Sequence, residues 1–103
     1  MNSNEPIVID TDVSKNEGKY QQTEIVTLRV RTETGKRNLI LKLLTTDKMT
    51  LVYQLIKPYL ENSKVSLFEL RTNFPSKAYV ENDPKNLKEL GLYPSCALVV
   101  QVK

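Results

Sequence analysis

Regular alternation of apolar and polar residues on both sides of one glycine is the feature that most constrains the fold. In residues 25–32 the apolar side chains point one way, and polar ones, including Arg29 and Arg31, point the other, as in a half-buried strand. Gly35 then provides a residue that accepts the positive φ of a tight turn, and the alternation resumes over residues 37–43. The sequence therefore predicts an antiparallel hairpin with one apolar face.

An apolar stripe with helical spacing follows this hairpin. Its members are Leu51, Val52, Leu55, Ile56 and Tyr59. Candidate N-caps lie at residues 45–50, and Pro58 should end the regular helix near Ile56 or Lys57, because proline lacks an amide hydrogen. We expect this helix to cover the apolar face of the hairpin.

Strand patterns and one turn complete the predicted order. We expect a strand at 67–72, a short strand at 78–80, a short helical turn at 86–90 that ends at Gly91, and a last strand at 97–102. On the last strand the residues expected to face inward are Leu98, Val100 and Val102. The succession is that of an α+β, ubiquitin-like β-grasp, in which a mixed sheet packs on one main helix and the last strand lies parallel to the first.

Residues 1–24 differ from the rest of the chain in charge and in pattern. They contain two basic against five acidic residues, a net charge of −3, whereas residues 25–103 contain 13 basic and seven acidic residues, a net charge of +6. Without sustained periodicity, 1–24 is predicted to be a flexible acidic tail or linker before the domain at 25–103. An alternative is that the apolar run at 7–9, followed by Asp10, adds to a sheet edge, since it resembles a SUMO-interacting motif.

The residue inventory argues against catalysis and metal binding. A chain of 103 residues supports one hydrophobic core, and it contains no histidine, the commonest general base. Cys96 is the only cysteine, so neither an internal disulfide nor a zinc site of several Cys and His ligands can form. We therefore expect a monomeric non-enzyme without cofactor or metal. With no long apolar run and no signal-peptide pattern, we expect it in the cytoplasm or nucleus, without membrane contact by this domain.

The residues around the third predicted strand resemble those of UBX domains. The resemblance rests on residues 68–76, which read FELRTNFPS, on Val30 and Arg31 before the Gly35 turn, and on residues 87–94, which read LKELGLYP. It covers nearly all of residues 25–103. UBX domains are ubiquitin-like adaptors, so the resemblance implies binding to the amino-terminal domain of the hexameric AAA ATPase valosin-containing protein, in ubiquitin-proteasome processes.

The resemblance also implies a set of partner-binding residues. The family binds through an arginine on the first strand and a Phe-Pro-Arg tip between the third and fourth strands, which Arg31, Phe74 and Pro75 match. Ser76 departs from the pattern, because it replaces a planar cation with a small hydroxyl. Lys77 is the neighbouring residue that could compensate.

Ras association is the main alternative function, and nucleic-acid binding is a weaker one. Clustered basic residues on the first hairpin would suit a Ras-association type β-grasp domain, which meets an acidic surface of a small GTPase. These residues are Arg29, Arg31, Arg37 and Lys42. Nucleic-acid binding is disfavoured, because no exposed aromatic residues are interleaved with the basic ones.

Overall fold

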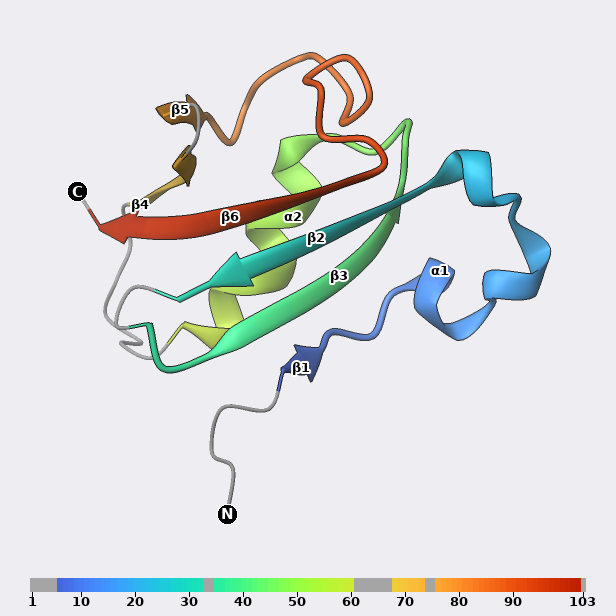
Figure 1. Ribbon diagram of the computed structural model, residues 1–103, viewed down its shortest axis with the longest axis horizontal. Coiled ribbons are helices and arrows are strands. Elements are labelled where there is room, and N and C mark those ends of the chain that lie inside the picture. Colours follow the sequence, from blue (N-terminus) through green and yellow to red (C-terminus); the bar gives the residue numbers. More distant parts are fainter. Residues whose placement is uncertain (1–5, 33–34, 61–67, 74–75, 103) are drawn as a thin grey trace.

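A mixed sheet with one main helix on a single face forms the core of the protein (Figure 1). The computed structural model describes residues 6–32, 35–60, 68–73 and 76–102, and in this part of the chain six strands pair in the order β1-β3-β2-β6-β4-β5. The elements in chain order are β1 (Ile7–Val8), α1 (Asp12–Lys15), the 3-10 turns η1 (Glu17–Lys19) and η2 (Gln22–Glu24), β2 (Ile25–Arg31), β3 (Asn38–Leu44), α2 (Met49–Ile56), the 3-10 turn η3 (Lys57–Tyr59), β4 (Phe68–Asn73), β5 (Ser76–Tyr79) and β6 (Ser95–Val102).

The predicted hairpin is present as β2 and β3. The two strands pair antiparallel from Ile25 with Leu44 to Arg31 with Asn38. Alternation fixes the register, because a shift by one residue would turn the buried leucines and valines out of the core. Gly35 adopts a φ of 76°, a left-handed conformation that favours glycine.

A long crossover places the last strand, β6, beside β2, the first strand of the hairpin. β6 pairs parallel with β2 and antiparallel with β4, and β5 forms the sheet edge beyond β4. This arrangement confirms the ubiquitin-like, α+β prediction. Leu98 and Val100 are buried as expected, but Val102 is 47% exposed. Val102 does face inward, since its register partner Phe68 is buried, but it ends β6 at the margin of the sheet, where fewer side chains can cover it.

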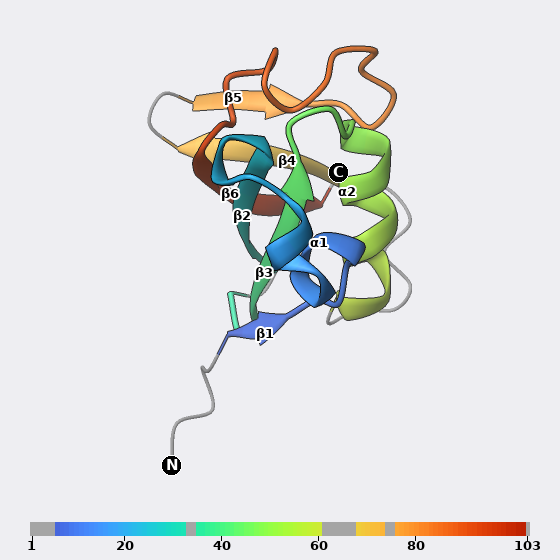
Figure 2. The same cartoon turned by 90° about the vertical axis from the view of Figure 1, so that its right-hand side faces the viewer.

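α2 covers one face of the sheet and leaves the other open, as Figure 2 shows from the side. Its residues Met49, Val52, Tyr53 and Ile56 are buried against the strands. The helix ends at Ile56, and Pro58 continues the chain as a 3-10 turn, in agreement with the steric effect of proline.

Two polar turns lie near the start of α2, at residues 44–48 and 86–90, and they use side chains in different ways. The N-cap of α2 is Lys48, which makes no side-chain cap, whereas the carboxylate of Asp47 accepts the Leu44 amide at 2.8 Å and so fixes the preceding turn. Asn86 and Glu89 exchange side-chain to backbone hydrogen bonds of 2.8 and 3.0 Å. The predicted helical turn is thus a single capped turn, and Gly91 leaves it with a φ of 81°.

The segment predicted to be a flexible tail packs on the domain instead. Residues 6–24 form an arm, so named here, in which β1 pairs parallel with β3 and the Ile9 amide donates to the Ile40 carbonyl at 2.9 Å. The side chains of Ile9 and Val13 are only 2% and 3% exposed. The apolar run at residues 7–9 therefore does add to a sheet edge, but that edge is β3 of the same chain.

Polar contacts continue along this arm. Thr11 Oγ1 donates to the Lys42 carbonyl at 2.6 Å, and it also caps α1 by accepting the Ser14 amide. Further on, Glu17 pairs with the Lys42 ammonium at 2.7 Å. The arm thus satisfies the backbone of β3, a strand that would otherwise present an unpaired edge.

Truncation of Ile9 tests whether the arm contributes to stability. We expect Ile9→Ala to lower the free energy of unfolding by about 2 kcal/mol, because it removes buried methyl groups and leaves a cavity. Val8→Ala is the matched control, since Val8 is the neighbouring β-branched residue and is 54% exposed. Denaturant unfolding of both variants checks this. Equal stability of the two variants would contradict a packed arm.

Candidate protein-binding surface

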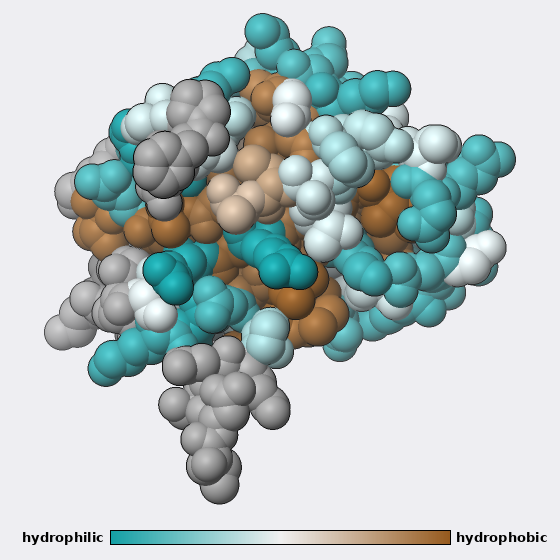
Figure 3. Space-filling model, in the orientation of Figure 1, coloured by the Kyte–Doolittle hydropathy of each residue, from teal (hydrophilic) through white to brown (hydrophobic). Residues whose placement is uncertain are grey.

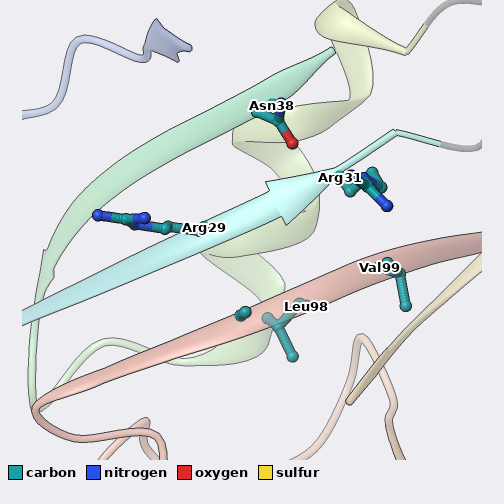
Figure 4. Close-up of a pocket in the computed structure, with 6 residues that line it drawn as sticks. Arg29, Arg31, Asn38, Leu98 and Val99 are labelled. Carbon is teal, nitrogen blue, oxygen red and sulfur yellow. The ribbon is translucent and has the colours of Figure 1, made fainter. Parts of the chain in front are cut away.

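The open face of the sheet carries cationic side chains around small apolar ones. Arg29 and Arg31 project from β2, and their register partners on β6 are Ala97 and Val99. Asn38 completes a shallow pocket of about 260 Å³ between β3, β2 and β6 (Figure 4). Figure 3 shows this face as hydrophobic surface interrupted by hydrophilic side chains. Such a mixture suits contact with a protein surface that is both apolar and acidic.

Arg31 lies at the end of β2 and is exposed. Its alternation with the buried Val30 turns it to the open face, as the sequence predicts. The Gly35 turn returns beside its aliphatic stem, since a Cβ built at residue 35 would lie 3.9 Å from Arg31 Cδ. Figure 4 places Arg31 between Asn38 and Val99, with Arg29 further back along β2.

The predicted Phe-Pro tip belongs to the connection between β4 and β5. Phe74 and Pro75 lie outside the described residues. The last residue of β4, Asn73, is the register partner of Ser76, the first residue of β5. The two predicted tip residues are thus all that separates the paired ends of these strands.

Ser76 and Lys77 fall on opposite faces of β5. Ser76 is exposed on the open face, where its hydroxyl accepts a hydrogen bond from Arg71 Nη2 at 2.9 Å. Lys77 shares the other face with Tyr79, and its ammonium lies 5.3 Å from the centroid of that ring. The structure therefore brings Ser76, but not Lys77, to the face that carries Arg31.

Arg71 is a residue of this surface that the motif comparison did not single out. It lies on β4, where its register partners are Val99 of β6 and Ala78 of β5. Besides its bond to Ser76, its Nη1 donates to Glu69 Oε2 at 2.6 Å. Alternation within β4 could have indicated it, because Glu69 and Arg71 face away from the buried Phe68 and Leu70.

Arg37 and Lys42, the other two cations named for Ras association, make polar contacts within the chain. Lys42 pairs with Glu17 of the arm, and Arg37 Nη1 donates to the Tyr59 carbonyl at 2.9 Å. The outer edge of β3 is itself occupied by β1. Two of the four cations on which the Ras-association alternative rests are therefore already bonded within the chain.

Cys96 is half-buried at the start of β6. Burial raises the pKa of its thiol, so the thiol remains protonated near neutral pH and is a poor nucleophile. Within the described ranges no group of three or more His, Cys, Asp or Glu side chains is placed to hold a metal ion. No helix among the described residues is long and apolar enough to cross a membrane.

Comparison with known proteins agrees with the fold and the motif. A strand order of this kind around one main helix defines a ubiquitin-like module, and its open face is suited to protein contacts. A family model described as UBX domain matches residues 21–102. The chain therefore belongs to the UBX family of ubiquitin-like protein-interaction domains. A search of curated proteins finds no match to it.

Proposed function

We propose that this UBX domain is an adaptor that binds the amino-terminal domain of the hexameric AAA ATPase valosin-containing protein. It acts as a monomer in the cytoplasm or nucleus, needs no cofactor, and links the ATPase to ubiquitin-dependent processes. The contact is made by Arg31 on the open sheet face, together with Phe74 and Pro75 between β4 and β5 and Ser76 at the start of β5.

The observation that carries this proposal is the common face of Arg31 and Ser76. The two residues come from strands that β6 and β4 separate, yet both project to the face opposite α2. Phe74 adds a large apolar anchor, whose burial in a partner would contribute about 1.5–3 kcal/mol. Pro75 fixes its own φ in advance and so reduces the entropy lost on binding.

An NMR titration of the isotope-labelled chain with the isolated ATPase domain tests the location of the contact. We expect shift changes at Arg31, Arg71, Ser76 and Val99, all on the open face, and only small changes at Ile7 on the far edge. A titration with a GTP-loaded Ras-like GTPase is the matched comparison. Shifts confined to β3 with the GTPase, and none with the ATPase domain, would replace this function by Ras association.

A further inference from the structure

Arg71 occupies the same transverse row of the open face as Arg31. Val99 is the register partner of both residues, parallel on β2 and antiparallel on β4. Neighbouring strands lie about 4.8 Å apart, so the backbones of the two arginines are about 10 Å from each other across β6. The row therefore presents two cations that flank one apolar side chain.

The guanidinium of Arg71 is held in a defined orientation. Glu69 Oε2 accepts from Nη1 at 2.6 Å, and Ser76 Oγ accepts from Nη2 at 2.9 Å. These bonds use two of the five N–H groups of an arginine side chain. The Arg71 side chain is still 33% exposed, whereas that of Glu69 is only 18% exposed. A carboxylate on a partner can therefore reach a guanidinium whose orientation is already fixed.

Ser76 is the position at which this chain lacks the arginine of the motif. Its hydroxyl draws the Arg71 guanidinium to the beginning of β5, beside the connection that contains Phe74 and Pro75. Lys77 cannot fill this role in the observed arrangement, because it faces away with Tyr79. Among the described residues, the cation that bonds to Ser76 is thus Arg71 of β4.

We propose that Arg71 is a partner-binding residue, which supplies from β4 the planar cation that Ser76 does not provide. The proposal rests on the proposed function, since it assigns a further contact on the same surface. Its ligand is a carboxylate beside an apolar patch of the ATPase domain. Arg71 forms an ion pair with that carboxylate on one side of Val99, while Arg31 contacts the ATPase domain on the other side.

Calorimetric titration of the ATPase domain with arginine variants tests this assignment. We expect Arg71→Ala to weaken binding about tenfold or more, because a charge-assisted hydrogen bond is lost. Arg71→Lys should also weaken it, since an ammonium lacks the forked donors. Lys57→Ala is the matched control: Lys57 is a cation of η3, beside α2 rather than on the open face, and its ammonium pairs with Glu81 at 3.3 Å. It should leave the affinity unchanged.

A rescue experiment separates binding from structural support. Ser76→Arg introduced into the Arg71→Ala variant should restore most of the lost affinity, because a guanidinium then returns from the neighbouring strand. Ser76→Arg alone should change the affinity less than about twofold, since the position already has a cation nearby. Because the Arg71–Glu69 pair is partly buried, melting curves of all variants are recorded beside the titrations, and the affinity should be lost and regained independently of the melting temperature.

Different outcomes contradict the inference and the proposed function. Unchanged affinity of Arg71→Ala would overturn the role of Arg71, and so would a loss that follows the melting temperature and is not rescued. If Arg31→Ala and Phe74→Ala weaken binding in the same series, the proposed function survives that failure. If the unmodified chain does not bind the ATPase domain, both are overturned.

Discussion

Replacement of Phe74 by alanine is expected to weaken binding of the ATPase domain by about 2 kcal/mol or more, equivalent to roughly 30-fold in the dissociation constant. An aromatic anchor contributes this much because its whole apolar surface leaves water in the complex. The thermal stability of the free domain should change little, because an interface residue makes its main contacts with the partner. Calorimetry of the complex and a melting curve for the variant check both parts.

Val8→Ala is the control for this prediction. Val8 is an exposed apolar residue on β1, which lies at the opposite edge of the sheet from β5. Its truncation should change neither affinity nor melting temperature appreciably. If Phe74→Ala lowers the melting temperature sharply and leaves the affinity unaltered, Phe74 belongs to the core and the proposed contact is wrong.

Tyr53→Phe is expected to lower the free energy of unfolding by about 2–4 kcal/mol. The Tyr53 hydroxyl accepts the Leu70 amide at 2.9 Å and donates to the Tyr79 carbonyl, so it joins α2 to both β4 and β5. The side chain is only 2% exposed. Loss of the hydroxyl leaves two buried backbone groups without this partner, at a cost of about 1–3 kcal/mol each.

Tyr59→Phe is the matched control for the hydroxyl deletion. Tyr59 lies at the end of η3, is half-buried, and uses its backbone carbonyl, which accepts from Arg37. Its conversion should cost less than about 0.5 kcal/mol. Denaturant unfolding of both variants decides the matter. Equal losses would mean that the buried hydroxyl of Tyr53 does not connect the helix with the strands.

Alkaline pH offers a second readout on Tyr53. Burial raises the pKa of its hydroxyl above the ordinary value, so the fold favours the protonated form. The corresponding stability is present below about pH 10, the pKa of the unfolded chain, and is lost as the pH rises through the folded pKa. The Tyr53→Phe variant should lack this part of the alkaline loss.

Local patterns made the central fold predictable from the sequence. The hairpin follows from alternation around Gly35, and Pro58 determines the end of α2, because both effects act within a few residues. The packing of the arm could not be derived in this way. Ile9 follows a two-residue strand and Val13 lies in a four-residue helix, both too short to show a period, and the elements that bury them come later in the chain.

The candidate surface was predictable to a smaller extent. Arg31 faces outward by the alternation of its own strand, and this expectation is confirmed. The face of Lys77 depends on where β5 begins. The sequence pattern predicts a start at residue 78, whereas the strand starts at Ser76. The bond between Arg71 and Ser76 required knowledge of the β4–β5 register, which the residue pattern does not contain.

Direct titration of the unmodified chain into the isolated amino-terminal domain of the ATPase, followed by calorimetry, tests the central proposal most directly. We expect saturable binding with one domain per chain, and a clear loss of affinity for Arg31→Ala measured beside it. Lys57→Ala, at an ion-paired cation of η3 beside α2, should bind like the unmodified chain. Absence of binding to the ATPase domain, or binding that Arg31→Ala and Lys57→Ala reduce equally, would contradict a specific contact through the open face of this UBX domain.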